Sequence, residues 1–482
     1  MRLPIGKIAE YTSADYLVKP WDLEKEACGI TWDSREVKPG FVYVALPGER
    51  VDGHDFVESA LRSGAVAALV MHELSDAALE AAKAEGAAIL RVDETAQAFT
   101  ALARGWRSHL QGKVIALTGS MGKTTTKNLV RDVLSTTFNT VATKANQNNE
   151  LGVPRTLLEA NADTEFVVVE MGMRGLGQLE ELCSFVKPDI SLITNVGECH
   201  MELLGSKDNI ARAKAEVLDA LTEGSGIAVL NAADGYCAKQ REWAKLDERN
   251  IDTFLYDGSG VCASGLPEAD LAAYATDIQL NEEGCPSFAL HLPDGAHPCA
   301  LALRGAHNVR NACAAAALGW ACGVSAEAIV AGLGASQAES GRQEVIRAQS
   351  GITVINDAYN ANPDSMCASI ALLCSMKVEG RRFAVLGDMG ELGDFTQEGH
   401  EKAGSFAASS SSLDCLLCVG DLSRFIALAA IRDGYPEQQV HQMPSREAAL
   451  AYLKEHMTPG DAVLVKASHS MELDRIAKGL LS

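Results

Sequence analysis

The chain has 482 residues, of which 47% are hydrophobic and 22% are charged, enough apolar material for about three globular domains. Its formal net charge of −22 argues against a broad surface for nucleic acid or for an anionic membrane. The 13 cysteines are scattered, and the chain shows neither a secretory signal nor a long apolar span. These features favour a cytoplasmic protein whose thiols are reduced.

Residues 1–111 are expected to form a first α/β domain. Its predicted strands are residues 29–32, 41–46 and 65–70. A long polar loop, 47–56, follows the second of them. Ser34, Arg35 and the loop amides could hold an anionic group such as a diphosphate. A solvated turn with a surface ion pair explains the same residues equally well.

Residues 112–338 are expected to form a central domain around the stretch Val-Ile-Ala-Leu-Thr-Gly-Ser-Met-Gly-Lys-Thr-Thr-Thr at 114–126. An apolar strand, a glycine turn and a helical pattern follow one another there, as in a phosphate-binding loop. Glycines let backbone N–H groups surround a phosphate, and the helix N-terminus adds partial positive charge. Lys123 can reach a terminal phosphate, and the Thr124 hydroxyl can bind Mg²⁺. The spacing is shorter than G-x-x-x-x-G-K-[ST], and the alternative is an accidental glycine-rich turn.

Two further side chains stand just past apolar strands of this domain. Glu170 ends the strand 166–170, where a second carboxylate that organises Mg²⁺ is expected. His200 follows the strand 190–196, at the ligand-facing edge of a parallel sheet. The alternatives are a solvent-facing acid at a strand end and a structural histidine.

The helix predicted over residues 207–221 carries a lysine in its apolar stripe. Ile210 and Val217 share one face with Lys214, whereas Glu216 points away from it. A lysine on a buried face must be neutralised, paired or modified. Periodicity alone favours a simpler interpretation, in which Lys214 lies at the edge of the stripe and its amine reaches solvent.

The rest of the central domain is less informative. Residues 250–304 contain short alternating runs with Gly and Pro, which suggest a small antiparallel region that caps the domain. An alanine-rich helix is expected to follow, to about residue 322. Asn308 is the expected N-cap of this helix, and Asn311, one turn later, could face a nucleotide.

Residues 339–482 are expected to form a third domain, another open α/β sheet. Its predicted strands are residues 352–357, 383–386, 413–419 and 462–466. Polar groups gather where three of these strands end, in the runs 357–363, 387–391 and 466–469. Cys415 and Cys418 are interpreted as buried strand cysteines, in preference to a redox or metal pair.

Several of these features occur together in one enzyme family. They are the loop at 119–126, Glu170, the Thr-Asn-Val-Gly run at 194–197 with His200, Lys214, and the helix with Asn308 and Asn311. In this combination the chain resembles the Mur ligase family, three-domain ATP-dependent enzymes that form amide bonds in peptidoglycan synthesis. The resemblance implies an α/β fold in which a central P-loop nucleotide-binding parallel sheet is flanked by an N-terminal α/β domain for a UDP substrate and a C-terminal Rossmann-like α/β domain.

Three stretches resemble one branch of this family, which adds D-alanyl-D-alanine to UDP-N-acetylmuramoyl-tripeptide. They are residues 146–154, residues 357–363 with Ser365 and Met366, and residues 387–393. The resemblance implies these two substrates and ATP, an acyl-phosphate intermediate, and a monomer with no nucleic-acid or membrane partner. The alternatives are a Mur ligase that adds the third peptide residue, a folylpolyglutamate synthetase, and, from a different class, a regulatory P-loop NTPase.

The resemblance also implies a role for each matching residue. ATP would be bound by Gly119, Ser120, Met121, Gly122, Lys123, Thr124, Thr125, Asn195, Asn308, Asn311, Arg342 and Asp357. Two Mg²⁺ ions would be organised by Thr124, Glu170, His200 and the carbamate that CO₂ forms on Lys214. The substrates would be held by Ser34, Arg35, Gly48, Asn148, Asn149, Tyr359, Asn360 and Asn362. The catalytic residues would be Lys123, Glu170, His200 and Lys214.

The sequence departs from the family pattern at two positions. The family's C-terminal run is usually Lys-Gly-Ser-Arg, whereas this chain has Lys-Ala-Ser-His at 466–469. A histidine is shorter than the arginine and only partly charged near neutral pH, so the anion contact expected of the arginine is not carried over. The phosphate loop carries Met121 where the family often has Asn or Ser. Because backbone amides do most of the phosphate binding, this second change is expected to matter less.

Overall fold

The structure is a computed structural model that describes residues 1–48, 51–261 and 265–481. It divides into two compact units. Unit 1 consists of Met1–Ala116, Phe138–Gly172 and Glu180–Ile190, and unit 2 consists of Leu117–Thr137, Met173–Leu179 and Ser191–Ser482. The boundary predicted at residue 112 does not coincide with the limits of either unit, and both predicted domain boundaries stay predictions. Residues 49 and 50 of the predicted polar loop lie outside the described residues.

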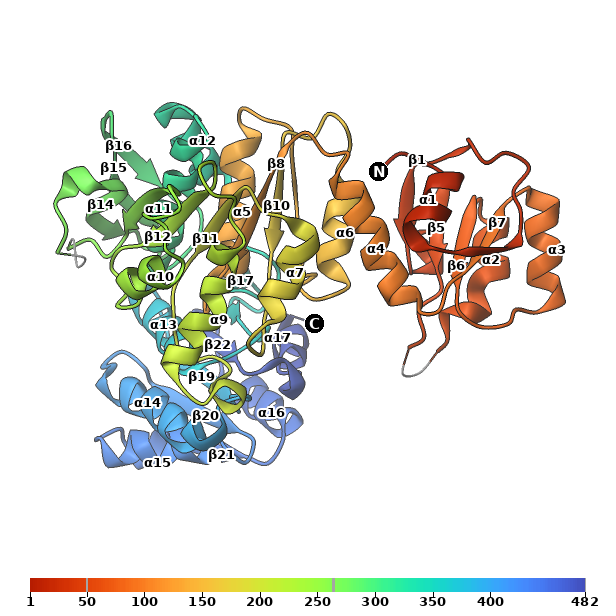
Figure 1. Cartoon of the computed structure of the whole chain (residues 1–482). Coiled ribbons are helices and arrows are strands. Elements are labelled where there is room, and N and C mark those ends of the chain that lie inside the picture. Colours follow the sequence, from red (N-terminus) through yellow and green to blue (C-terminus); the bar gives the residue numbers. More distant parts are fainter. Residues whose placement is uncertain (49–50, 262–264, 482) are drawn as a thin grey trace. The chain divides into compact units, whose positions relative to one another are not determined.

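The first part of unit 1 is an α/β layer with the strand order β2-β7-β6-β5-β4 (Figure 1). Its strands are β2 (Asp15–Val18), β4 (Gly29–Thr31), β5 (Phe41–Val44), β6 (Ala67–Val70) and β7 (Ala88–Arg91), with a small pair β1 (Leu3–Pro4) and β3 (Glu26–Ala27) beside α1. Its helices are α1 (Ile5–Thr12), α2 (Val57–Arg62), α3 (Asp76–Glu85) and α4 (Thr95–Arg107). The strands β4 to β7 are parallel, and β2 is an antiparallel edge. The apolar runs of β5 and β6 are buried, as the predicted strands require.

The second part of unit 1 belongs to the predicted central domain. Its elements are the parallel strands β9 (Thr140–Ala142) and β10 (Phe166–Glu170), helix α6 (Gly152–Glu159) and most of α7 (Gln178–Val186). Strand β8 (Lys113–Thr118) starts in unit 1, and its last two residues belong to unit 2. The predicted strand 166–170 is therefore confirmed at both ends.

The central part of unit 2 carries the phosphate loop and a run of strands in the order β16-β15-β14-β13-β12-β11. Its strands are β11 (Ile190–Ile193), β12 (Ile227–Asn231), β13 (Asp252–Asp257), β14 (Leu271–Leu280), β15 (Pro286–Leu292) and β16 (Gly295–Ala300). Its helices are α5 (Lys123–Ser135), α8 (Met201–Leu204), α9 (Lys207–Asp219), α10 (Cys237–Trp243), α11 (His307–Ala321) and α12 (Ala326–Ala335). The predicted antiparallel region is present as β14–β16, but it extends the sheet because β14 pairs in parallel with β13.

Helix α11 is rich in alanine because it packs closely on α5. A Cβ atom at Gly319 of α11 would lie 2.6 Å from a methyl carbon of Val133 in α5. Small side chains let the two helix axes approach, and α5 is the helix that begins at the phosphate loop. The predicted alanine-rich helix thus supports the loop from behind.

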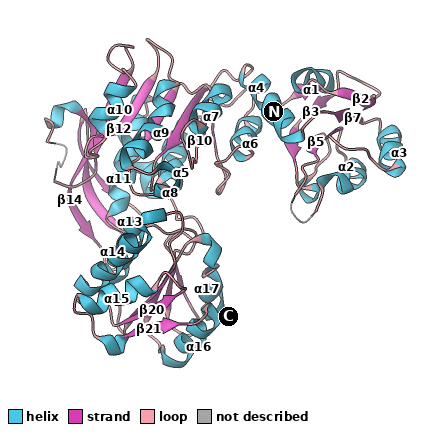
Figure 2. Ribbon diagram, turned by 60° about the horizontal axis from the view of Figure 1, so that its bottom comes forward, coloured by secondary structure: helices cyan, strands magenta, loops and turns pink. Residues whose placement is uncertain are grey.

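The C-terminal part of unit 2 is a doubly wound sheet with the order β17-β18-β22-β19-β20-β21. Figure 2 shows β20 and β21 of this sheet with helices around them. Its strands are β17 (Glu344–Arg347), β18 (Thr353–Asn356), β19 (Arg382–Gly387), β20 (Cys415–Val419), β21 (Val440–Met443) and β22 (Ala462–Lys466). Its helices are α13 (Pro363–Ser375), α14 (Thr396–Ser409), α15 (Arg424–Arg432), α16 (Arg446–His456) and α17 (Asp474–Leu481). One core packs α13–α15 on one face of the sheet, and a second core packs α16 and α17 on the other.

This part agrees with the sequence except at its edges. The four predicted strands are present, and Cys415 and Cys418 are buried in β20 as expected. The sequence analysis missed β17, which pairs antiparallel with β18, and the edge strand β21. None of the helices in the described ranges is long and apolar enough to cross a membrane.

Candidate active site

The phosphate loop needs its two glycines for different reasons. Gly119 has φ 153° and Gly122 has φ 73°, both in the range that favours glycine. A Cβ atom on Gly119 would lie 1.8 Å from Oγ1 of Thr194, and one on Gly122 would lie 2.5 Å from Oδ1 of Asn311. The loop therefore passes too close to its neighbours for a side chain at either position, so the fold itself requires both glycines.

The segment 194–197 holds the loop through side chains and backbone. The Thr194 hydroxyl donates to the carbonyl of Met121 at 2.6 Å. The Asn195 amide makes a reciprocal pair with Met121, accepting from its N–H at 3.0 Å and donating to its carbonyl at 3.1 Å. The Ser120 hydroxyl accepts from the Gly197 N–H at 2.8 Å. Asn195, predicted to bind the nucleotide, thus fixes the conformation of the loop. Met121 takes part in these contacts through its backbone N–H and carbonyl.

The side chains at the start of α5 lie where the motif predicts. Lys123 folds back over the loop, and its amine donates to the Gly119 carbonyl at 2.8 Å and to the Ser120 carbonyl at 3.4 Å. Thr124 is 2% exposed, and Thr125 is partly exposed. The loop carbonyls thus hold the ammonium group of Lys123 beside the N–H groups that open the helix.

Lys214 of α9 is buried, with 2% of its surface exposed. Its pKa is lowered to about 7, mainly by burial and in addition by the charge of Lys123, while Cys199 acts in the opposite direction. The interpretation that periodicity favoured, an amine that reaches solvent at the edge of the stripe, is wrong. The stripe is fully covered, so the helix presents a buried lysine whose amine is neutral in a substantial fraction of molecules near pH 7.

Glu216, two residues further along α9, is predicted to point away from the apolar stripe, yet it too is buried, with 8% of its surface exposed. Its carboxylate accepts from the N–H of Gly177 at 2.7 Å and from that of Leu179 at 3.1 Å. These N–H groups open α7, and the negative charge of Glu216 stabilises that helix end.

Glu170 is completely buried at the end of β10 in unit 1. Its Oε1 accepts from the amide of Asn148 at 2.9 Å, and its N–H donates to the Thr143 hydroxyl at 3.0 Å. Asn149 uses its side-chain oxygen to accept from the N–H of Gly152 at 3.0 Å, which opens α6. The alternative of a solvent-facing acid is excluded, and the amide-rich stretch orients the carboxylate.

His200 lies in the left-handed region, with φ 62°, at the start of α8. Its Nδ1 is 2.7 Å from Oε2 of Glu391, although no aligned hydrogen bond forms there. Arg174 is 3.6 Å from the other oxygen of this carboxylate. The contact with His200 is the main cause that lowers the pKa of Glu391. A residue of the Gly-Asp-Met-Gly-Glu run at 387–391 thus reaches the predicted metal-site histidine.

The chemistry of the predicted cation ligands fits Mg²⁺ only in part. A hard cation prefers oxygen ligands, which the Thr124 hydroxyl and the Glu170 carboxylate supply. The amine of Lys214 would not bind such an ion, whereas a carbamate on the same nitrogen would offer two oxygens. A neutral amine is what CO₂ reacts with, so the buried Lys214 suits that modification.

Asp357 lies at the centre of a buried network in the C-terminal part. Its Oδ2 accepts from the Lys466 amine at 2.7 Å and from the Ser369 hydroxyl at 2.5 Å. Its Oδ1 accepts from the N–H of Gln343 at 3.1 Å, next to Arg342. Both carboxylate oxygens of Asp357 thus accept hydrogen bonds from within the protein. The bond from Gln343 fixes the backbone segment that includes Arg342.

The remaining predicted residues of the C-terminal part surround one aromatic ring. The Arg342 guanidinium lies 4.0 Å from the centre of the Tyr359 ring, and the His469 ring is 5.8 Å from it. The Asn360 carbonyl accepts from Lys466 at 2.9 Å. Asn362 caps α13, because its Oδ1 accepts from the N–H of Ser365 at 2.9 Å. His469, at the sequence position where the family pattern has an arginine, therefore lies beside Tyr359 in this chain.

The asparagines of α11 correct one further prediction. Asn308 is not the N-cap, since the helix begins at His307 after Ala306. Its amide instead donates to the Arg304 carbonyl at 2.6 Å, and its oxygen accepts from Asn311 at 2.8 Å. Asn311 contacts the loop at Gly122, so the pair supports the phosphate loop from α11.

The predicted substrate residues of the N-terminal part are much more exposed. The Arg35 side chain is 86% exposed and pairs with both oxygens of Asp33, the closer at 2.6 Å. These hydrogen bonds lower the pKa of Asp33 to about 2. Ser34 opens the short 3₁₀ turn Ser34–Glu36, and Gly48 donates its N–H to the carbonyl of Val51. Both interpretations of Ser34 and Arg35, a diphosphate site and a solvated turn, remain compatible with this geometry.

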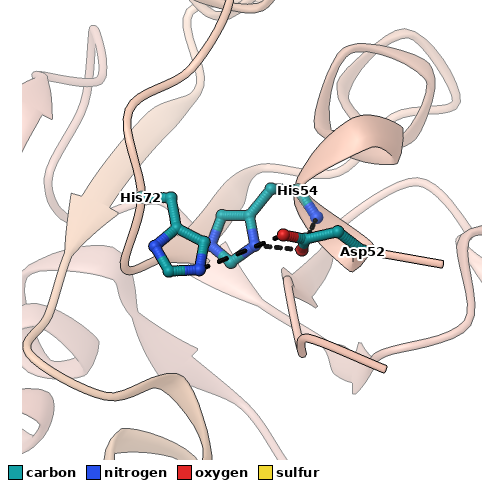
Figure 3. Close-up of side chains that lie close together, drawn as sticks. All are labelled: Asp52, His54 and His72. Carbon is teal, nitrogen blue, oxygen red and sulfur yellow. Dashed lines mark hydrogen bonds and ion pairs between the residues drawn. The ribbon is translucent and has the colours of Figure 1, made fainter. Parts of the chain in front are cut away.

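Near Gly48, three side chains in unit 1 lie close enough to hold a metal ion (Figure 3). His54 Nδ1 is 2.6 Å from Oδ1 of Asp52, and His72 is 4.0 Å from Oδ2. The N–H of Met71 donates to Nε2 of His54 at 3.0 Å, which places the ring proton on Nδ1. With both nitrogens in use, His54 has no free lone pair for a metal, and the group fixes the loop after β5.

Cys199 and Lys466 are site residues that sequence reasoning missed. The Cys199 thiol contacts the carbonyl of Ser120 in the phosphate loop, and burial raises its pKa. Lys466 is 2% exposed and binds Asp357. Lys466 could have been recognised from the sequence, because a lysine at the end of an apolar strand is unusual. No pattern in the sequence indicated Cys199.

Three family models match the chain. They are the catalytic domain of the Mur ligase family at residues 26–107, the Mur ligase middle domain at 117–319, and the glutamate ligase domain of Mur ligases at 341–469. Among curated proteins, the UDP-N-acetylmuramoyl-tripeptide–D-alanyl-D-alanine ligase of Bacillus subtilis is 34% identical over 459 residues, which cover 94% of this chain and 93% of the relative.

Solved structures agree with these matches. MurF from Acinetobacter baumannii has a TM-score of 0.82 and 31% identity, over 100% of this chain and 99% of that one. MurF from Thermotoga maritima in complex with ADP has a TM-score of 0.74 and 26% identity, over 94% and 97% of the two chains. The predicted three-domain α/β architecture is confirmed. The chain belongs to the Mur ligase family.

Proposed function

We propose that the protein is an ATP-dependent ligase that joins D-alanyl-D-alanine to UDP-N-acetylmuramoyl-tripeptide through an amide bond. The observation that supports it best is the buried Lys214 near Lys123, because a regulatory NTPase has no evident use for a second lysine, buried and with a lowered pKa, at its phosphate loop. The choice of substrates rests on the name of relatives that match over nearly the whole chain.

The chemistry explains why ATP is needed. A carboxylate is a poor acyl donor, because its leaving group would be oxide. Transfer of the γ-phosphoryl group from ATP to the tripeptide carboxylate gives an acyl phosphate and ADP. The amine of D-alanyl-D-alanine then attacks the acyl carbon, loses a proton, and expels inorganic phosphate from the tetrahedral intermediate. The two anions that react first repel each other, so positive groups must lie between them.

Lys123 supplies one of these positive groups. In this proposal its amine leaves the carbonyls of Gly119 and Ser120 and moves to the terminal phosphate. The N–H groups from Gly119 to Thr125 surround the phosphates at the start of α5. Asn195 and Asn311 keep the loop in shape, Asn308 positions Asn311, and Arg342 with Asp357 approaches the nucleotide from the C-terminal domain.

Two Mg²⁺ ions would neutralise phosphate charge and act as Lewis acids. Thr124, Glu170 and His200 are their proposed ligands, together with a carbamate on Lys214. The Lys214 amine adds to CO₂ and releases one proton, which converts a neutral amine into an anion. Burial favours the reaction at this lysine because it lowers the pKa of the amine and so increases the unprotonated fraction near pH 7.

The remaining residues are assigned to the substrates. Arg35, Ser34 and Gly48 would hold the UDP part, with the Arg35 guanidinium leaving Asp33 or sharing it with the diphosphate. The peptide and the dipeptide would lie against Asn148, Asn149, Tyr359, Asn360 and Asn362. We further propose that the enzyme acts as a monomer in the cytoplasm, where its nucleotide substrates are found.

Phosphate release and product mass test this function together. Purified protein with Mg-ATP and UDP-N-acetylmuramoyl-tripeptide should release phosphate only when D-alanyl-D-alanine is added, and the product should be the nucleotide-linked pentapeptide. Replacing the dipeptide by a single amino acid in this assay tests whether the protein is instead one of the other Mur ligases. Phosphate release that ignores the dipeptide, with no gain in mass on the nucleotide, would contradict the proposal and favour an NTPase.

A further inference from the structure

Three consecutive residues after β11 each contact a different element of the C-terminal part of unit 2. Glu198 is 3.6 Å from the amine of Lys402 in α14, and His200 is 2.7 Å from Glu391. Between them, Cys199 accepts a hydrogen bond from the Asn362 amide at 3.1 Å. The two outer contacts each include a carboxylate, whereas the middle one joins an amide to a thiol.

The middle contact continues into the phosphate loop. The Cys199 thiol donates to the Ser120 carbonyl at 3.5 Å while its sulfur accepts from Asn362. The other polar atom of the Asn362 side chain caps α13 by accepting from the N–H of Ser365. One thiol therefore links the backbone of the phosphate loop to the first turn of α13.

The Ser120 carbonyl has a second donor, the amine of Lys123 at 3.4 Å. If Lys123 moves to a terminal phosphate, the thiol becomes the remaining side-chain donor to that carbonyl within the segment described. The hydrogen bond from Cys199 then gains in strength, because the carbonyl is no longer shared. The position of Lys123 therefore affects the hydrogen bonding of Cys199, which also binds the N-cap residue of α13.

We propose that Cys199 is a positioning residue that couples occupancy of the phosphate loop to the seating of the C-terminal domain through Asn362. The inference rests on the proposed ligase function, because it assigns Cys199 to the turnover of that site. Cys199 touches no substrate in this proposal. Its effect reaches the reaction through α13, whose first residues follow the Tyr359–Asn362 stretch.

Two substitutions at Cys199 separate the hydrogen bonds from the volume of the side chain. Cys199→Ala removes both bonds and should lower kcat roughly five- to thirtyfold, while KM for ATP stays within about twofold, as expected for two hydrogen bonds lost after nucleotide binding. Cys199→Ser can donate and accept and should restore most of kcat. Cys374→Ala, at the far end of α13, is the matched control and should keep the wild-type values.

A kcat for Cys199→Ala within about twofold of the wild type would overturn the inference. So would a serine variant no better than alanine, because the effect would then be one of packing.

A substitution from the other side of the contact tests the coupling. Asn362→Asp keeps the oxygen that caps α13 but loses the N–H that donates to Cys199. It should lower kcat, and adding Cys199→Ala should lower it little further, because both changes break one chain of bonds. An unchanged kcat, or effects that multiply in the double variant, would contradict the coupling.

Small-angle X-ray scattering separates this inference from the proposed function. A non-hydrolysable ATP analogue with Mg²⁺ should make the wild type more compact, and Cys199→Ala should reduce that change. If the wild type forms the amide but the variant matches it in both kinetics and scattering, the inference alone fails. If the wild type forms no amide, the proposed function fails, and the scattering difference still decides the role of Cys199.

Discussion

The nucleotide side and the N-terminal substrate side of this protein differ in how their polar groups are held. At the phosphate loop, the side chains of Thr194, Asn195 and Lys123 bond to the loop backbone, and Lys214 nearby is buried. At the N-terminal side, the Arg35 side chain is 86% exposed and has Asp33 as its partner. The first site is built before a ligand arrives, whereas the second consists of charges at a solvated turn.

The difference predicts what each site contributes. Buried, oriented groups act strongly because they are not screened and need no reorganisation. Exposed charges contribute less to binding and more to the capture of a charged ligand. Substitutions on the nucleotide side should therefore reduce catalysis and perturb pH behaviour, whereas those at Arg35 should mainly affect the affinity for one substrate.

The largest effect is expected at Lys123. Lys123→Ala removes the amine that the loop carbonyls hold beside the phosphate site, and kcat should fall about a thousandfold. Lys113→Ala, an exposed lysine at the start of β8, is the matched control and should retain activity. A Lys123→Ala enzyme with at least a tenth of the wild-type kcat would show that the loop amides suffice.

The next largest effect is expected at Lys214. Lys214→Gln keeps most of the volume but cannot form a carbamate, and kcat should fall about a hundredfold if a cation loses an anionic ligand. Lys207→Gln in the first turn of the same helix is the control.

The modification itself can be observed by ¹³C NMR. Protein exchanged with ¹³C-bicarbonate should show a carbamate signal that is absent in Lys214→Gln and present in Lys207→Gln. A fully active wild type that shows no such signal would contradict the proposal that Lys214 carries a carbamate.

A pH-dependent effect on stability is expected at His307, at the start of α11. Burial lowers its pKa to about 4, although the residue keeps partial exposure to solvent. Above pH 6.5 the ring is neutral in both states; between pH 6.5 and 4 the unfolded chain binds the proton more tightly, so the free energy of unfolding falls as pH falls. The loss should be about 1–2 kcal/mol, less than the roughly 3 kcal/mol of a fully buried ring.

Urea unfolding of the wild type and of His307→Gln between pH 7 and 4 tests this prediction. The variant should lose part of the slope, whereas His456→Gln, at an exposed position in α16, should keep it. If the free energy of unfolding changes with pH equally in the wild type and in His307→Gln, protonation of the His307 ring does not destabilise the folded state.

The smallest effect is expected at Arg35. Arg35→Ala should raise KM for the UDP-linked substrate about three- to tenfold with kcat nearly unchanged, because an exposed guanidinium adds modest affinity. The rise in KM should shrink as salt is added, since salt screens the wild-type contact. A KM that does not change at low salt would assign Ser34 and Arg35 to a solvated turn, the alternative that the sequence leaves open.

Local patterns were sufficient where chemistry and secondary structure coincide along the chain. The glycines and Lys123 define the phosphate loop because strand, turn and helix are neighbours in sequence, and the structure gives each glycine a close contact. Glu170 could be placed for the same reason, as the last residue of an apolar strand.

Patterns failed where a residue's environment comes from distant segments. Periodicity turned Glu216 away from the apolar stripe but could not show that the start of α7 covers it. Periodicity favoured a Lys214 amine in solvent, yet other elements bury it. The N-cap predicted at Asn308 is absent, and the Asn308 amide reaches back to Arg304 instead. No sequence pattern indicated Cys199, because its partners lie in the phosphate loop and at Asn362.

The most direct test of the account follows the oxygen atoms of the tripeptide carboxylate. With ¹⁸O in that carboxylate, transfer through an acyl phosphate places one labelled oxygen in the released inorganic phosphate for each amide formed. Mass spectrometry of the phosphate should therefore show one ¹⁸O per molecule, together with the pentapeptide product. Pentapeptide formed with unlabelled phosphate would contradict the acyl-phosphate route, and labelled phosphate without pentapeptide would contradict the proposed acceptor.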